Sequence, residues 1–156
     1  MKVLLVSSNR LKLVLPPFPL GVAYLASNMH PRHEVKVVDL MFLDDYQGDL
    51  RRAIKSFRPD VIGISLRNVD NQSFVDPVMY IDHDKEVASI CRECSSAPIV
   101  LGGGALSTYP EQYLSYLGAD FGVVGEGERA FNSLLDALEN GHGNAAVPGL
   151  VHRDGG

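Results

Sequence analysis

Glycine and serine follow three apolar runs of the sequence, and residues of these types at a strand end suit the binding of a large ligand. Residues 100–104 read Val-Leu-Gly-Gly-Gly, residues 63–65 read Gly-Ile-Ser, and residues 125–128 read Gly-Glu-Gly-Glu. A glycine at a strand end lets a flat ligand lie against the backbone, because no Cβ blocks the approach and positive φ is allowed. Backbone N–H groups in such a turn, before a helix, can also hold a ligand edge or tail. We favour a ligand site over a turn built only for tight packing.

The elements that must position these residues alternate along the chain. Apolar runs typical of buried strands are separated by segments with apolar residues at i, i+3, i+4 and i+7. The predicted strands are 2–7, 34–39, 60–65, 97–101 and 120–124. The predicted helical stripes lie at 22–29, 50–57, 87–94 and 131–138, with a weaker helix over 110–117. This alternation is the signature of βαβ units and a parallel sheet.

We therefore predict an α/β fold of the flavodoxin-like (Rossmann-like) type, a three-layer sandwich around a five-stranded parallel sheet with strand order 2-1-3-4-5. Residues 1–145 are assigned to this domain. A short apolar piece near 149–152 suggests an extra edge strand, and residues 146–156 are interpreted as that strand and the start of a linker to a further domain. In such a fold the loops that follow the strands meet at one edge of the sheet, where ligands bind.

Two further loops contribute candidates at this edge. The loop after the first strand contains three prolines, among them Pro17, which form either an apolar wall for a ring-shaped ligand or a stiff connection. Ser65 ends the third strand and offers a hydroxyl to a ligand or caps a turn. Arg67 presents a guanidinium to the same edge, unless it pairs with Asp70 or Asp76.

Three titratable residues near the predicted edge have simpler explanations. Glu126 and Glu128 precede or begin the last helix, where carboxylates favour the positive end of the helix dipole. His83, near the start of the third helix, could cap the helix, contact solvent or ligate a metal. Because Asp82 and Asp84 flank it, we interpret His83 as a solvated residue at the helix start.

The cysteines and the other histidines are assigned to the core or to the opposite edge. Cys91 and Cys94 have the C-x-x-C spacing of a metal site, but both lie on the apolar stripe of one helix and no further ligands are nearby. We therefore interpret them as core residues. His30, His33 and His142 follow helix ends and belong at the edge opposite the ligand site.

Composition limits the class of protein. The 156 residues suit one domain, and a hydrophobic content of 46% is enough for an ordinary core. The net charge of -5 argues against nucleic-acid binding, which needs a basic face. Two cysteines fit a reduced, cytoplasmic protein better than a disulfide scaffold. No stretch approaches the roughly 20 apolar residues of a membrane span.

An ordered set of segments resembles the N-terminal cobalamin-binding domain of B12-dependent radical S-adenosylmethionine proteins. The similarity extends over nearly the whole chain, and no single segment carries it. The segments are Lys2-Val-Leu-Leu-Val, Pro-Phe-Pro-Leu-Gly-Val-Ala-Tyr-Leu at 17–25, His-Glu-Val-Lys-Val-Val-Asp at 33–39, Arg-Pro-Asp-Val-Ile-Gly-Ile-Ser at 58–65, 100–104, 120–128 and Pro-Gly-Leu-Val at 148–151.

The resemblance implies that cobalamin lies over the loops after the first and third strands, with its nucleotide tail beside the glycine turns. The D-x-H-x-x-G motif that supplies a histidine ligand in the wider family is absent, because no histidine precedes position 30. The radical branch commonly lacks this motif, so we expect base-off cobalamin without a histidine ligand and with Arg67 or Asn68 near its lower face. The implied cofactor-binding residues are Ser8, Asn9, Pro17, Leu20, Gly21, Ser65, Leu66, Arg67, Asn68, Gly102, Gly103, Gly104, Gly125, Glu126 and Gly127.

The resemblance also implies a partner domain. The C-x-x-x-C-x-x-C motif of the radical domain does not occur in these residues. S-adenosylmethionine and a [4Fe–4S] cluster are therefore expected in a C-terminal radical S-adenosylmethionine domain further along the chain. Catalysis, by methyl transfer or related radical chemistry, is not assigned to these residues alone. The alternative is a docking or scaffolding module that keeps the fold without the cofactor.

Overall fold

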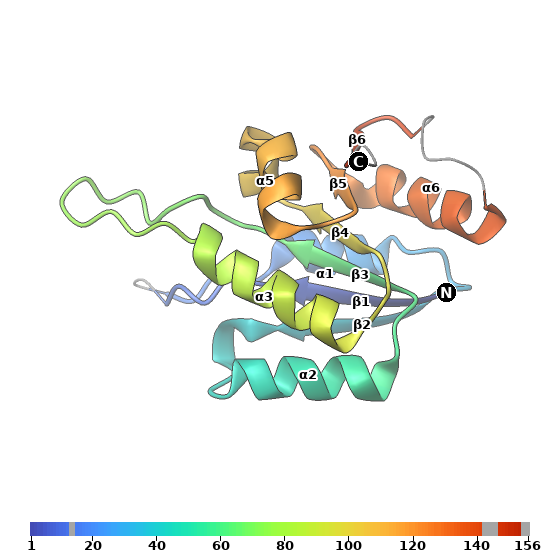
Figure 1. Cartoon of the computed structure of the whole chain (residues 1–156), viewed down its shortest axis with the longest axis horizontal. Coiled ribbons are helices and arrows are strands. Elements are labelled where there is room, and N and C mark those ends of the chain that lie inside the picture. The colour runs from blue at the N-terminus through green and yellow to red at the C-terminus, as the bar shows by residue number, and fades with distance from the viewer. Residues whose placement is uncertain (13–14, 142–146, 154–156) are drawn as a thin grey trace.

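The structure is a computed structural model that describes residues 1–12, 15–141 and 147–153, and its centre is a six-stranded sheet (Figure 1). The strands are β1 (Lys2–Ser7), β2 (Glu34–Asp39), β3 (Val61–Ser65), β4 (Ile99–Gly102), β5 (Phe121–Val123) and β6 (Leu150–His152). Their order is β2-β1-β3-β4-β5-β6, and β6 alone pairs antiparallel. The predicted order of the first five strands and the extra edge strand are both confirmed. His142 and the last residues of the predicted linker lie outside the described residues, and the proposed domain division stays a prediction.

Helices cover both faces of the sheet. They are α1 (Leu20–Ser27), η1 (Leu40–Phe42), α2 (Tyr46–Phe57), α3 (Ile81–Cys94), α4 (Gly104–Thr108), α5 (Pro110–Leu117) and α6 (Gly127–Asn140). The predicted stripes and the weaker helix correspond to α1, α2, α3, α5 and α6. The 3-10 helix η1 and the five-residue helix α4 were not predicted, because neither is long enough to show a helical period. None of the helices in the described part of the chain has the length and apolar composition needed to cross a membrane.

The sheet separates two apolar clusters. Leu4 and Val6 of β1 face the cluster formed with α2, α3, α4 and α5, whereas Val3 and Leu5 face the cluster formed with α1 and α6. Burial on both faces explains why β1 has an uninterrupted apolar run. Cys91 is completely buried in the first cluster, as predicted, and burial raises the pKa of its thiol to about 12.

The register of the sheet brings the predicted strand ends together. Ser7 pairs with Ser65, and Ser65 pairs with Gly102, so the last residues of β1, β3 and β4 form one row. The segment 66–80 then extends as an arm beyond this carboxyl edge, closed by a bridge between Asp70 and Met79 (Figure 1). The glycine and serine ends of the sequence therefore share one edge, as predicted.

Candidate functional site

Three adjoining pockets open at the carboxyl edge of the sheet. We name them the deep pocket (about 260 Å³), the bridging pocket (about 310 Å³) and the polar pocket (about 180 Å³). The deep and bridging pockets share Gly21, Ser65 and Gly103, while the bridging and polar pockets share Asn9 and Arg67. The three pockets therefore form one continuous binding surface.

The structure brings fourteen of the fifteen candidate residues to this surface. The candidates in the deep pocket are Gly21, Ser65, Gly102, Gly103, Gly125, Glu126 and Gly127. Those in the bridging pocket are Asn9, Pro17, Leu20, Gly21, Ser65, Arg67, Gly103 and Gly104. Those in the polar pocket are Ser8, Asn9, Arg67 and Asn68.

Leu66 is the exception. It continues the alternation of Ile62 and Ile64, so its side chain is completely buried in the cluster beneath α2 and α3. Its backbone N–H donates to the carbonyl of Gly102 at 2.8 Å, and its carbonyl accepts from Ala105 at 3.1 Å. The side chain of Leu66 therefore lines none of the three pockets, and its part in cofactor binding stays a prediction. These two backbone hydrogen bonds of Leu66 hold the glycine turn at 102–104 in position.

The deep pocket is apolar and lies between the sheet and the helices α1 and α6. Its inner wall includes Leu5, Val100 and Phe131. A Cβ added at Gly21 would meet no protein atom within 4 Å, so this glycine leaves the opening shared with the bridging pocket free. The pocket can therefore hold an aromatic or apolar group that enters between α1 and the ends of the strands.

The polar pocket contains a buried carboxyl group that the sequence analysis missed. Asp84 of α3 is only 3% exposed, and its Oδ1 accepts from Ser8 Oγ at 2.8 Å. Burial raises the pKa of the Asp84 carboxyl to about 6, opposed by the Ser8 hydrogen bond and by the nearby His83. The sequence analysis names Asp84 only as a neighbour of His83, but Asp84 continues the stripe of Val87 and Cys91 by helical spacing. That spacing was a usable signal.

His83 is not a solvated residue, and that interpretation is wrong. Its side chain is half-buried, its Nε2 lies 2.8 Å from the carbonyl oxygen of Ser8, and its ring packs edge-on against Tyr46. Since a carbonyl only accepts, Nε2 carries the proton of this hydrogen bond. His83 therefore holds the loop after β1 in place.

The arginines of the site have different surroundings. Arg67 is exposed and takes part in none of the ion pairs among the described residues, so the expected alternative, a salt bridge to Asp70 or Asp76, does not form there. Arg10, in contrast, donates to the carbonyls of Leu40 and Leu43. Arg67 is thus a cation of the bridging and polar pockets that remains available to a ligand.

Asp84→Asn is expected to change how stability depends on pH. The pKa of Asp84 rises from 3.8 to about 6 on folding, so its contribution is fully present below about pH 3.8 and is lost as pH rises through about 6. This loss amounts to about 3 kcal/mol by about pH 7.5, and an asparagine does not undergo it. Urea unfolding should therefore show the variant gaining about 2 kcal/mol on the wild type between about pH 4 and pH 7.5.

The matched control is Asp82→Asn, which removes an exposed carboxylate from the same helix. Its unfolding free energy should run parallel to that of the wild type across this pH range. Parallel curves for Asp84→Asn as well would contradict the assignment of a raised pKa.

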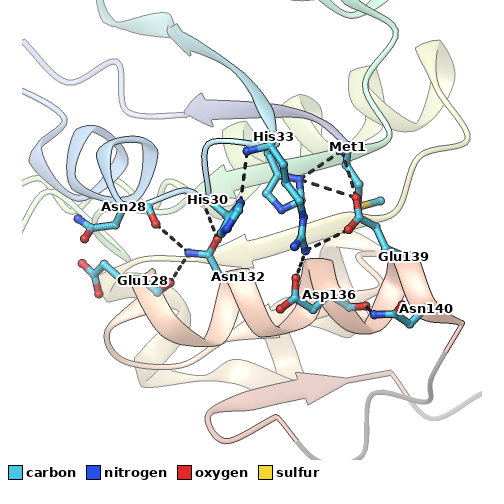
Figure 2. A network of polar contacts seen from close by, with 10 residues as sticks. Met1, Asn28, His30, His33, Glu128, Asn132, Asp136, Glu139 and Asn140 are labelled. Carbon is cyan, nitrogen blue, oxygen red and sulfur yellow. Dashed lines mark hydrogen bonds and ion pairs between the residues drawn. The ribbon is translucent and has the colours of Figure 1, made fainter.

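Two of the histidines lie at the opposite, amino edge of the sheet, as predicted (Figure 2). The backbone N–H of His30 donates to Asn132 Oδ1 of α6 at 3.1 Å. The Nδ1 of the buried His33 lies 3.2 Å from the amino group of Met1. Burial, reinforced by that positive amino group, lowers the pKa of His33.

The cluster around His33 has the residue types of a metal site. His33, Asp136 and Glu139 place one possible ligand atom each within 4.8 Å of one another. However, the guanidinium of Arg32 contacts both carboxylates, and the amino group of Met1 contacts Glu139 at 3.2 Å (Figure 2). Cations of the protein already neutralise the acidic groups. We therefore interpret the cluster as ion pairs that fasten α6 to the amino edge of the sheet.

The strand order and the three pockets define a cofactor-binding domain of the flavodoxin-like class. Residues 9–135 match the model of the B12 binding domain family, so the chain belongs to that family. This confirms the resemblance found in the sequence.

Curated relatives and solved structures agree with this assignment. The chain is 32% identical over 152 residues to tryptophan 2-C-methyltransferase of Streptomyces laurentii, covering 96% of this chain and 25% of the relative. It is 34% identical over 140 residues to an uncharacterised methyltransferase of Pyrococcus horikoshii, covering 88% and 28%. The fold of the chain also matches a solved structure with a TM-score of 0.90 and 30% identity. That structure is of the radical S-adenosylmethionine methyltransferase TsrM from Kitasatospora setae, with cobalamin and a [4Fe–4S] cluster bound. The match covers 97% of this chain and 27% of that chain. The chain thus spans about a quarter of the length of the relatives it matches.

Proposed function

We propose that this chain binds cobalamin, base-off and without a histidine ligand, as the cobalamin module of a radical S-adenosylmethionine methyltransferase. The observation that carries the proposal is the continuous surface of three pockets at the carboxyl edge of the sheet. When bound, cobalamin supplies the ability to accept and donate a methyl group, while the protein orients and tunes it. The family match and the printed activities of the relatives support the same function.

The residues of the surface fit the different parts of cobalamin. The apolar deep pocket suits the aromatic nucleotide tail, because its wall offers Leu5, Val100 and Phe131 and its mouth has no side chain at Gly21. The bridging pocket, with Pro17 and Leu20 on one side, suits one edge of the flat corrin. Because Gly21 has no side chain, a group can enter there without displacing a side-chain atom.

The loop after β1 contains no histidine, which supports cobalamin without a histidine ligand. Among the described residues, His83 is the histidine that lines one of these pockets, and its Nε2 donates to the carbonyl of Ser8. Arg67 is exposed between the bridging and polar pockets, and Asn68 follows it. We propose that Arg67 or Asn68 lies near the lower face of the corrin, and the titration below tests whether His83 takes that place instead.

The test is a titration of the purified chain with hydroxocobalamin, followed by its visible spectrum and by co-elution on gel filtration. A saturable change with the spectrum of base-off cobalamin is expected. His83→Ala should leave the cobalt absorption bands unchanged, whereas Arg67→Ala should weaken binding by about tenfold, the effect of one lost charged contact. Absence of saturable binding would reject the function and favour a docking or scaffolding module.

Exposed apolar side chains around the site support a second domain. Leu15 and Phe18 of the loop after β1 are 78% and 72% exposed, and Phe74 and Val75 at the tip of the arm are almost completely exposed. Clusters of exposed apolar residues mark interaction surfaces. The partner is the C-terminal radical S-adenosylmethionine domain of the same protein, which holds S-adenosylmethionine and the [4Fe–4S] cluster.

The location of the protein follows from its thiols. Cys91 and Cys94 are both free, although they lie one turn apart on α3. Free thiols are typical of a reducing compartment. The two thiols therefore support the cytoplasmic location that we propose.

A further inference from the structure

The carboxyl group of Asp84 is unusual because it is buried without a cation. It forms none of the ion pairs among the described residues, and its only side-chain hydrogen bond there is the one from Ser8 Oγ to Oδ1. Oδ2 has no partner in the described part of the chain, although Asp84 lines the polar pocket. A buried carboxyl with a free oxygen is costly unless another group supplies a donor.

The hydroxyl of Ser8 cannot satisfy all of its neighbours. It lies 2.8 Å from Asp84 Oδ1 and 3.1 Å from the carbonyl oxygen of Ser65, but it has a single hydrogen. When Asp84 is protonated, it can donate to Ser8, which then donates to Ser65. When Asp84 is ionised, it takes the hydrogen of Ser8, and its second oxygen still needs a donor. The ionised site is therefore incomplete without a further N–H or O–H group.

A second polar group of the same pocket is also without a partner. The hydroxyl oxygen of Tyr80 is buried and makes no hydrogen bond with the described residues, and Tyr80 lines the polar pocket beside Asp84. The buried hydroxyl of Tyr113 on α5 is unpartnered in the same sense. Tyr113 lines none of the three pockets, whereas Tyr80 belongs to the polar pocket. Buried polar groups are normally hydrogen-bonded, and an unpartnered Tyr80 hydroxyl in the same pocket as the Asp84 carboxyl indicates that a polar ligand group completes the site.

The remaining groups of the pocket define the chemistry of that ligand. Asn9, Asn68 and Arg67 supply N–H donors, while Asp84 supplies an acceptor. A primary carboxamide is complementary, because its NH₂ group donates and its carbonyl accepts. Cobalamin carries several such groups around the corrin ring, and the polar pocket adjoins the bridging pocket through Asn9 and Arg67.

We propose that the polar pocket binds one carboxamide arm of the corrin, with Asp84 accepting a hydrogen bond from the amide nitrogen. This inference rests on the proposed cobalamin function and deepens it, since it names Asp84 as the group that distinguishes a corrin with a carboxamide arm from one with a carboxylate arm. A carboxylate arm would place a second negative charge against Asp84 once both are ionised, so the pocket rejects it. The other groups near Asp84 are His83 on α3, Ser8 after β1, Tyr80 before α3 and Tyr113 on α5, and Asp70 on the arm acts on the same Tyr113.

The experiment compares hydroxocobalamin with its singly hydrolysed isomers, in each of which one propionamide arm is a carboxylic acid. Dissociation constants are measured by equilibrium dialysis against the purified chain at about pH 8, where Asp84 is ionised. One isomer should bind about tenfold more weakly than hydroxocobalamin, whereas the others should bind within about twofold of it. Asp84→Asn should bring the disfavoured isomer to within about twofold of hydroxocobalamin, and the control Asp82→Asn should leave the tenfold difference.

The outcomes separate the inference from the proposed function. If hydroxocobalamin binds and all isomers bind equally well, the inference is overturned and the cobalamin function stands. If hydroxocobalamin does not bind, the cobalamin function fails, and the inference fails with it. A tenfold difference that persists in folded Asp84→Asn would also overturn the inference.

A measurement on the wild type alone covers the case in which Asp84→Asn does not fold. At about pH 5, protonated Asp84 can donate to a carboxylate arm, so the discrimination against the disfavoured isomer should shrink by about tenfold relative to about pH 8. A discrimination that is independent of pH would contradict the role of Asp84.

Discussion

Gly103→Ala should destabilise the chain by about 3 kcal/mol, more than any other single methyl group added at the carboxyl edge. Gly103 has φ +97, a region that side chains rarely adopt, and a Cβ there would lie 2.4 Å from the carbonyl oxygen of Leu66. That carbonyl cannot move away freely, because it accepts from Ala105 at 3.1 Å. The cost of the positive φ and the cost of the steric overlap with Leu66 therefore add in the loss of unfolding free energy. Urea unfolding, monitored by circular dichroism, measures the loss.

Gly102→Ala is the matched control for this prediction. It adds the same methyl group one residue earlier, where φ is not positive and the nearest atom to a Cβ is 4.0 Å away. Its unfolding free energy should stay within about 0.5 kcal/mol of the wild type. Equal losses for Gly102→Ala and Gly103→Ala would mean that the turn tolerates both side chains equally, contrary to the structure.

Gly21→Leu should lower the affinity for hydroxocobalamin by about 100-fold without loss of fold stability. The reason is steric, because Gly21 lines both the deep and the bridging pockets and nothing of the protein lies within 4 Å of its missing Cβ. A leucine would fill the space that the two pockets share. Spectroscopic titration measures the affinity, and urea unfolding of the ligand-free chain measures the stability.

The control places the same side chain elsewhere on α1. Ser27→Leu adds a leucine at an exposed position at the end of this helix, and Ser27 lines none of the three pockets. It should bind hydroxocobalamin with the affinity of the wild type. Gly21→Ala should leave the unliganded chain as stable or more stable by about 0.5 kcal/mol, because glycine is a poor helix former. Unchanged affinity in Gly21→Leu would move the cofactor away from this opening.

The sheet and its carboxyl edge were predictable because their signals are local. Apolar runs such as 2–7 mark strands buried on both faces, and the type of the residue that ends each run is visible in the sequence. Parallel pairing then forces Ser7, Ser65 and Gly102 into one row. Side-chain contacts were not needed to predict that these residues share one edge of the sheet.

The polar pocket was not predictable in the same way. The search for helical periods counted apolar residues, so it passed over Asp84, although this residue occupies an inward position of α3. The contacts of His83 come from Ser8 and Tyr46, which are distant in sequence. Leu66 lies between Ser65 and Arg67 in the sequence, but strand alternation turns its side chain to the opposite face. The position of Asp84 follows the helical period of α3, whereas the contacts of His83 join segments that are distant in sequence and have no periodic signal.

The separation of the apolar residues into two clusters has a consequence for cooperativity. The deep pocket borders the cluster of α1 and α6, whereas the polar pocket borders α3, which belongs to the other cluster. One molecule seated across all three pockets would act as a cross-link over the end of the sheet. Because a ligand stabilises whatever must be intact to bind it, both helical layers would then have to open together. Loading the domain would therefore strengthen the coupling between the two helical layers, which already share the strands β1, β3 and β4.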